Sequence, residues 1–163
     1  MLQADICDAI PGWAQINGRN FYLSSEEENL RWDVAEARAI EHPGGRLFEV
    51  RSSADNAVFE AVKNCYRGRI WIGGNDLAQT GNWVWASNGY EIDGYENFDN
   101  SEAKTGDCLD VRLEANFAWL KSACDGSGIS HAFIVETGCY FKPKENYFHL
   151  LKSIPFNECS FYS

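Results

Sequence analysis

The chain has 163 residues, of which 45% are hydrophobic and 14% aromatic, so it can bury a sizeable core as a single domain. Its net charge of −10 excludes the basic stripe that phosphate binding requires, and we therefore expect no nucleic-acid partner. No apolar run is long enough to cross a membrane, so no membrane span is expected.

The predicted elements start with an N-terminal hairpin over residues 7–22, in which two short strands are joined by a turn at Asn17-Gly18. A first helix is expected from about 26 to 41, because Ser25 precedes three glutamates. The Ser25 hydroxyl would accept from the backbone N–H of Glu28, whose carboxylate would reach back, as in a capping box. Acidic residues also suit the positive end of the helix dipole.

Both predicted helices show one apolar face. In the first helix, Trp32, Ala35 and Ala39 recur at helical spacing. A second helix is expected to begin at about Ser53 or Ala54. Its apolar stripe consists of Ala57, Val58, Ala61, Val62 and Cys65.

Short extended segments make up the rest of the body. They are expected near residues 47–50, 69–73, 83–86, 108–113 and 131–136. A strand region, two helices and then several short strands are typical of the α+β class. We therefore predict one α+β domain over residues 1–136, with a C-terminal extension over 137–163 that is rich in cysteine and aromatic residues and packs on the domain.

The cysteine content indicates three disulfides and an oxidising compartment. A zinc site is the alternative, but the sequence has neither Cys-x-x-Cys nor His-x-x-x-His spacing. We predict a secreted, extracellular protein from the cysteines alone. They are Cys7, Cys65, Cys108, Cys124, Cys139 and Cys159.

A long segment with almost no apolar periodicity runs from Ala86 to Asp107. Loops of about twenty residues are uncommon in compact domains, and they are usually functional or mobile. Aromatic strand-like pieces enclose this one, with Trp71 and Trp83 before it and Trp119 after it. We expect the working surface of the protein to lie on this loop.

Several short motifs, in this order and spacing, resemble the C-type lectin-like domain over roughly residues 21–136. The motifs are Trp32-x-x-Ala35, Leu47, Trp71-Ile72-Gly73, Trp83-x-Trp85, Asn97-Phe98, Cys108 and Trp119-x4-Cys124. The resemblance implies a disulfide-stabilised α+β fold in which two helices flank small antiparallel sheets. It also implies a long projecting loop that carries calcium and sugar in many members.

The resemblance further implies a Cys108–Cys124 disulfide. In the chain-entropy model, a closed loop of about fifteen residues is worth about 3 kcal/mol. The family's second disulfide is absent, because its matching positions are Ala39 and Val135. An apolar contact between these two residues can substitute for the bridge.

The other four cysteines can pair in three ways, and the sequence leaves the choice open. Our preference is for two bonds that join the extension to the domain body, because Cys139 and Cys159 both lie beyond the shared region. Their partners would then be Cys7 and Cys65. The alternative for Cys65 is a buried free thiol on the stripe of the second helix.

The calcium site that the resemblance implies has lost most of its ligands. Sugar-binding members use a Glu-Pro-Asn tripeptide, an acid two residues before the loop-closing cysteine, and an Asn-Asp pair after the tryptophan. The matching residues here are Glu102-Ala103-Lys104, Gly106 and Leu120-Lys121. Without the proline, a cis peptide at Ala103 would cost about 2.5–4 kcal/mol. Two lysines also place positive charge where the metal would sit, so we expect the primary calcium–sugar site to be missing.

A different cation site in the loop stays open as an alternative, because calcium takes six to eight oxygen ligands and the loop is rich in acids. The metal-ligand candidates are Glu96, Asp99 and Glu102. The other interpretation is that these acids are only solvated, and we therefore assign no cofactor.

We expect a non-catalytic recognition module, because the sequence lacks a Gly-x-Ser-x-Gly elbow, a phosphate loop and a His-Glu-x-x-His helix. The ligand would be an extracellular protein or other macromolecule, held by the loop without calcium, with aromatic side chains as anchors. The candidate ligand-binding residues are Tyr90, Glu91, Asp93, Tyr95, Glu96, Asp99, Glu102 and Lys104.

Two other functions remain open. One is a lectin that binds glycans through a rearranged calcium site or a metal-independent pocket with aromatic stacking. The other is an acidic structural protein of an extracellular matrix or mineral surface, which rests on net charge alone. Nothing in the sequence predicts an oligomeric state.

Overall fold

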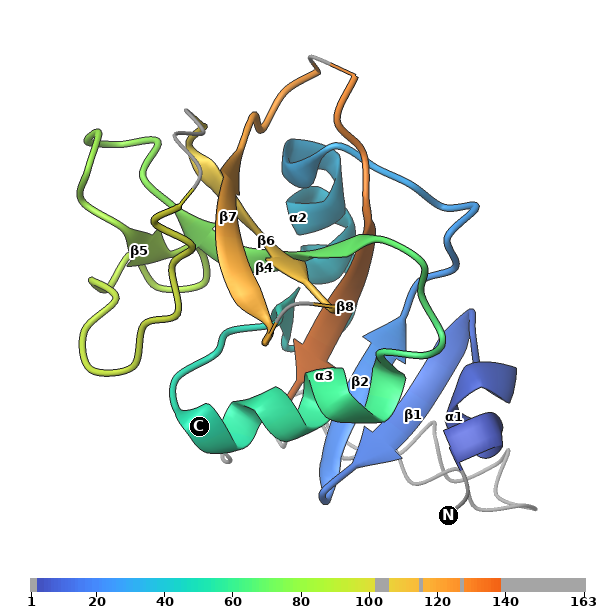
Figure 1. Ribbon diagram of the computed structural model, residues 1–163. Helices are drawn as coiled ribbons and strands as arrows, with labels where there is room; N and C mark the ends of the chain where they lie inside the picture. The colour runs from blue at the N-terminus through green and yellow to red at the C-terminus, as the bar shows by residue number, and fades with distance from the viewer. Residues whose placement is uncertain (1–2, 102–105, 115, 127, 139–163) are drawn as a thin grey trace.

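The computed structural model describes residues 3–101, 106–114, 116–126 and 128–138, and it has the predicted α+β architecture (Figure 1). The helices are α1 (Gln3–Asp8), α2 (Trp32–Glu41) and α3 (Asn56–Val62), and the 3₁₀ turn η1 (Ser53–Asp55) precedes α3. The strands are β1 (Gly12–Ile16), β2 (Arg19–Leu23), β3 (Gly45–Leu47), β4 (Arg69–Asn75), β5 (Val84–Trp85), β6 (Cys108–Arg112), β7 (Ala118–Ser122) and β8 (Ala132–Thr137).

Strand β8 lies in the middle of the molecule (Figure 1). The sheet order is β1-β2-β8-β4-β6-β7, with β3 paired to β8 and β5 paired to β4. The pair β4–β8 is parallel, and the other strand pairs of the described residues are antiparallel. The predicted antiparallel pairs are thus joined into one sheet by a parallel contact.

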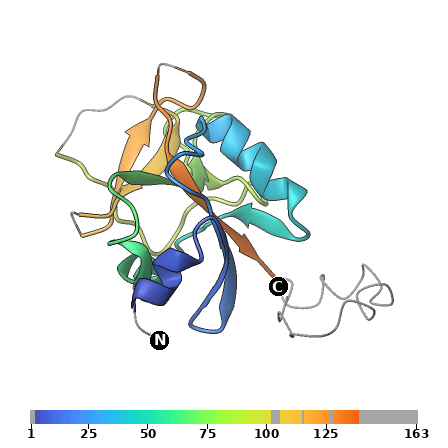
Figure 2. The ribbon, with the colours of Figure 1, turned by 90° about the vertical axis from the view of Figure 1, so that its right-hand side faces the viewer.

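The sheet is covered by apolar side chains on both faces. Along β8, Ile134 belongs to the buried cluster that includes α3, whereas Phe133 and Val135 belong to the cluster that includes α2. Strand β4 follows the same alternation, with Ile72 in the first cluster and Trp71 in the second. Figure 2 shows α2 on the side of the molecule opposite β7.

Helix α2 begins at Trp32, later than the sequence predicts. The Ser25 hydroxyl does accept from the N–H of Glu28, at 3.2 Å, but this contact closes a turn and starts no helix. The backbone N–H and C=O of Leu30 both pair with His131 in an extended bridge. A residue held in that conformation cannot also be helical, so the helix starts only after it.

The buried face of α2 is the predicted one. Trp32, Ala35 and Ala39 are buried, and Ala39 lies in the same apolar cluster as Val135. Both residues are fully buried. Apolar packing therefore occupies the place of the family's absent second disulfide.

The second predicted helix consists of η1 followed by α3. Val58 and Val62 of the predicted stripe are buried, but Ala57 is exposed and Phe59 is fully buried. The reason is that a phenylalanine ring removes far more apolar surface from water than an alanine methyl group does. The helix is turned so that the ring faces the core.

The N-terminal region differs from the prediction in one respect. The expected hairpin exists, but it consists of β1 and β2 and runs over residues 12–23, joined at Asn17-Gly18. Helix α1 precedes it and was not predicted. Its six residues are too few to show a helical period in the sequence.

The disulfides confirm one expectation and correct another. Cys108 and Cys124 are bonded, as the resemblance implies. Cys7 on α1 is bonded to Cys65 just after α3, so Cys65 is no free thiol. The preferred pairing of these two cysteines with the extension is wrong, because α1 brings Cys7 next to α3.

The C-terminal extension is described only as far as residue 138. Its expected packing on the domain, and the partners of Cys139 and Cys159, lie outside the described residues. Within the part of the chain that the structure describes, no helix is both long and apolar enough to cross a membrane.

Candidate functional site

The long loop joins β5 to β6, as predicted, and some of its aromatic side chains belong to the core. Phe98 and Tyr95 meet Trp119 edge to face, with ring centroids 5.3 and 6.0 Å apart. The Tyr95 hydroxyl accepts a hydrogen bond of 2.8 Å from the side-chain amide of Asn56. Tyr95 is therefore engaged in holding the loop on the domain, and it is a weaker candidate for a ligand anchor than Tyr90.

Tyr90 lies on a tight turn that follows β5. The backbone N–H of Trp85 donates to the C=O of Tyr90 at 3.0 Å, and the N–H of Gly89 donates to the C=O of Trp85 at 2.8 Å. The Asn88 side chain accepts from the N–H of Tyr90 at 2.9 Å. Gly89 has φ +69°, a conformation that glycine adopts without strain. The turn holds Tyr90 with its side chain 70% exposed.

A hollow of about 560 Å³ lies beside this turn. We call it the Tyr90 pocket. Its lining residues are Arg51, Trp85, Gly89, Tyr90, Glu91 and Asp93. Three of the predicted ligand-binding residues, Tyr90, Glu91 and Asp93, therefore surround one concave surface. Glu96, also predicted, is exposed but does not line the pocket.

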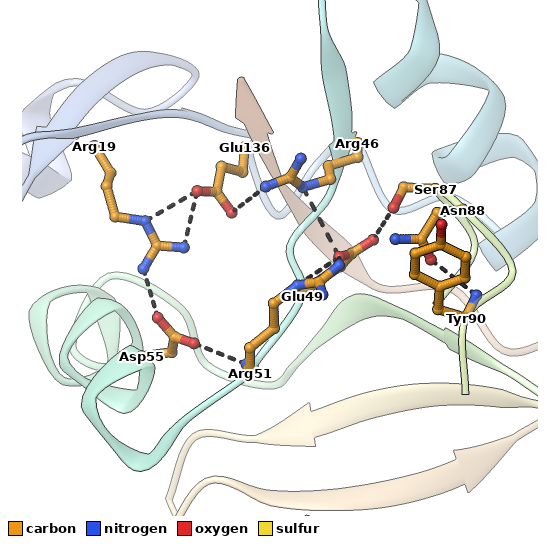
Figure 3. A network of polar contacts seen from close by, with 9 residues as sticks. All are labelled: Arg19, Arg46, Glu49, Arg51, Asp55, Ser87, Asn88, Tyr90 and Glu136. Carbon is orange, nitrogen blue, oxygen red and sulfur yellow. Dashed lines mark hydrogen bonds and ion pairs between the residues drawn. The ribbon is translucent and has the colours of Figure 1, made fainter. Parts of the chain in front are cut away.

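A buried carboxylate fixes the pocket to the domain (Figure 3). Glu49 is only 2% exposed, and its side chain accepts hydrogen bonds from Ser87 in the turn and from Arg51 in the pocket wall. The Arg51 Nε–Glu49 Oε2 distance is 3.1 Å. A buried charge needs such partners, because an unpaired carboxylate would lose its hydration without compensation. The hydrogen bond from Ser87 that helps to satisfy Glu49 also holds the turn against the domain.

The network extends from Glu49 to the far end of β8 (Figure 3). Arg46 lies 4.0 Å from Glu49 and 3.6 Å from Glu136. Arg19 on β2 then joins Glu136 to Asp55 of η1. Charged residues of β2, β3, η1 and β8 are thereby connected to the turn that carries Tyr90.

The described residues at the family's calcium positions do not fit the metal. Gly106 supplies no side-chain oxygen, and Leu120 is buried with 1% exposure. The Lys121 amino group lies over the rings of Trp83 and Phe98, 5.6 and 5.5 Å from their centroids, and thus places a positive charge beside the loop. Residues 102–105, which include Glu102 and Lys104, lie outside the described residues.

The acids proposed for a rearranged cation site do not converge in the described residues. Glu96 is exposed, whereas Asp99 binds the N–H of Ser101 at 2.9 Å and pairs with Arg112 at 3.8 Å. Among the residues that the structure describes, no group of three or more His, Cys, Asp or Glu side chains could hold a metal ion.

One pair of carboxylates beside the loop was not singled out from the sequence. The N–H of Asp76 donates to the C=O of Asp107, and one buried oxygen of Asp76 has no hydrogen-bond partner in the described residues. Partial desolvation and the neighbouring Asp76 carboxylate raise the pKa of Asp107. Two carboxylates fall well short of the six to eight oxygens that calcium takes.

A second hollow, of about 430 Å³, lies near His131, away from the long loop. The His131 ring lies tilted against Trp71, with ring centroids 4.6 Å apart, and its Nε2 lies 3.3 Å from a carboxylate oxygen of the fully buried Asp110. Ser122 is also buried and donates a hydrogen bond to the same carboxylate. His131 is thus a partly buried neighbour of Asp110.

Sequence reasoning missed two residues that line the Tyr90 pocket, namely Arg51 and Trp85. The turn itself carried a signal, because Asn88-Gly89 is a common two-residue turn between strands. Arg51 had none, since it comes from a connection far from the loop in sequence.

The family model described as the C-type lectin domain matches residues 28–130. The chain belongs to this family. Among curated relatives, it is 35% identical over 89 residues to lectin BRA-3 of Megabalanus rosa, covering 53% of this chain and 51% of that protein. It is 34% identical over 83 residues to a type-2 ice-structuring protein of Brachyopsis segaliensis, covering 51% of this chain and 45% of that protein. The C-type lectin chain thus spans about half the length of the curated relatives it matches.

A solved structure agrees with this assignment. A calcium-independent type II antifreeze protein is 26% identical, with 77% of this chain and 90% of that chain covered, and its TM-score is 0.61. The C-type lectin fold predicted from the sequence motifs is therefore confirmed.

Proposed function

We propose that this C-type lectin domain is a non-catalytic extracellular recognition module. It binds a protein or other macromolecular ligand through the Tyr90 pocket and does not need the family's usual calcium site. The observation that carries the proposal is the large exposed ring of Tyr90 on a turn fixed by backbone hydrogen bonds and by Glu49.

Pre-organisation makes this ring a good anchor. Aromatic side chains dominate the energetics of many protein interfaces, and a residue that is already held in place loses little conformational entropy on binding. The relatives' names include a lectin and ice-structuring proteins, which supports the view that one fold presents different ligand surfaces. Two disulfides support an extracellular location.

The alternative is a glycan-binding lectin. One array experiment separates the two functions: glycans and secreted or cell-surface protein ectodomains are probed in calcium and in chelator. We expect an ectodomain signal in both buffers. It should fall about tenfold or more in Tyr90→Ala, as for an interface hot spot.

Ile40→Ala is the matched control, because Ile40 is 64% exposed but lies on α2. This variant should retain the wild-type signal. A glycan signal without any ectodomain signal would support the lectin alternative. An ectodomain signal that both variants keep would place the binding surface elsewhere.

A further inference from the structure

Among the residues that the structure describes, the Tyr90 pocket carries negative charge that neighbouring cations do not balance. The network in Figure 3 contains three arginines, Arg19, Arg46 and Arg51, and three carboxylates, Glu49, Asp55 and Glu136. These charges offset one another. Glu91 and Asp93 also line the pocket, and neither forms an ion pair with another described residue.

Arg51 is the one cation among the described residues that line the pocket, and it is already engaged. Arg51 directs both Nε and one Nη to the buried Glu49. An anionic ligand would have to compete with that bond and would also meet Glu91 and Asp93. The pocket therefore disfavours carboxylates and phosphates.

The aromatic part of the pocket suits a positive charge. Tyr90 is largely exposed, and the nearly buried Trp85 also lines the pocket. A cation within about 6 Å of an aromatic ring is attracted by the electron density on its face. Ring and carboxylates together form a concave, negatively charged surface with one apolar side.

We propose that the Tyr90 pocket receives a basic side chain from the surface of a protein partner. This rests on the proposed function and names the chemistry of the ligand. Arginine suits the pocket better than lysine, because its planar guanidinium stacks on a ring and donates forked hydrogen bonds to carboxylates. Glu91 and Asp93 supply the acceptors, and Tyr90 supplies the stacking surface.

The direct test uses N-acetyl-arginine-N-methylamide as a probe, titrated into the full chain while backbone amide resonances are followed by NMR. The matched probe is the citrulline analogue, which keeps the shape but has no charge. We expect the arginine probe to shift amides in residues 85–93 and the citrulline probe to leave them unchanged. Equal shifts with both probes, or none with arginine, would overturn the proposal.

A pair of variants separates the effect of the pocket's own charges from the effect of the protein's net charge. Glu91→Gln/Asp93→Asn removes both exposed carboxylates of the pocket, whereas Glu41→Gln/Glu114→Gln makes the same charge change at exposed positions outside it. The pocket variant should bind the arginine probe about fivefold more weakly, and the control should bind like wild type. Equal weakening in both would mean that only the net charge matters.

The proposal and the proposed function can fail separately. If an ectodomain signal depends on Tyr90 but not on Glu91 and Asp93, the recognition surface stands and the basic side chain is wrong. If the arginine probe binds as expected but no ectodomain signal depends on Tyr90, the pocket is cation-selective and the proposed function is wrong.

Discussion

Arg19 donates a hydrogen bond of 2.9 Å from Nε to Oε1 of Glu136, and so joins the N-terminal hairpin to the last strand. A second hydrogen bond, of 2.5 Å, runs from its Nη1 to Asp55. The guanidinium also lies 5.5 Å from the ring centroids of Phe21 and Phe48. One side chain thus links β2, η1 and β8 at the end of the polar network.

Arg19→Ala should lower the free energy of unfolding by about 2 kcal/mol. The substitution takes a charged partner from the largely buried carboxylates of Glu136 and Asp55, although the partial exposure of Arg19 limits the effect. Urea denaturation measures the change. Arg38→Ala is the control, because its ion pair with Glu41 is exposed, and it should change stability by less than about 0.5 kcal/mol. If Arg19→Ala lowers the free energy of unfolding as little as Arg38→Ala does, the network does not stabilise the fold.

Glu36→Gln should stabilise the protein at neutral pH. Burial and the nearby charge of Glu49 raise the pKa of Glu36, so its ionised form is disfavoured in the folded state. Stability from this group is greatest when it is protonated, and it is lost as pH rises through the unfolded and then the folded pKa. The gain from the substitution should therefore be present at pH 7 and vanish near pH 4, as followed by urea midpoints. A gain of equal size at both pH values would refute this assignment.

Calcium should leave the melting temperature unchanged. The described residues at the family's metal positions include Gly106 and Leu120, neither of which offers a side-chain oxygen. A ligand that binds only the folded state at about a hundred times its dissociation constant adds about 2.7 kcal/mol, which is several degrees in this size range. Thermal unfolding in millimolar calcium and in chelator measures the difference. A rise that Glu96→Gln/Asp99→Asn abolishes would instead reveal a rearranged site in the loop.

Removing the Cys7–Cys65 disulfide should cost somewhat more chain entropy than removing Cys108–Cys124. The sequence separations are 58 and 16, which correspond to about 4 and about 3 kcal/mol in the chain-entropy model. Paired serine substitutions and urea denaturation test the order. Peptide mapping of the wild-type chain under non-reducing conditions should recover Cys7 linked to Cys65. A peptide that links Cys7 to the extension would contradict this pairing.

The sequence was most informative where a residue's role depends on local pattern or on a family motif. The buried face of α2 follows from the helical spacing of Trp32 and Ala35, and Cys108–Cys124 follows from the resemblance. The start of α2 did not follow, because a local capping pattern at Ser25 competes with the long-range bridge between Leu30 and His131. Only tertiary structure decides that competition.

In the candidate site, too, residues that are close in sequence were predicted, whereas contacts between distant segments were not. Tyr90, Glu91 and Asp93 are consecutive or nearly so, and their place in the loop was enough to select them. Arg51 and Glu49 belong to one segment, and this segment meets the turn through the hydrogen bond from Ser87 to Glu49, a contact across 38 residues that no local pattern relates. Tyr95 was selected for the same reason as Tyr90, but its ring packs against Trp119 of the core.

The central position of β8 constrains how the chain can be made. It pairs with β2, β3 and β4, and Tyr22 meets Val135 across more than a hundred residues of sequence. During synthesis, β2, β3 and β4 cannot pair with β8 until the segment up to Thr137 has left the ribosome. Such long-range pairing slows folding and leaves open strand edges that can associate with other chains. The nascent C-type lectin chain therefore exposes unpaired strand edges until nearly the whole domain has emerged.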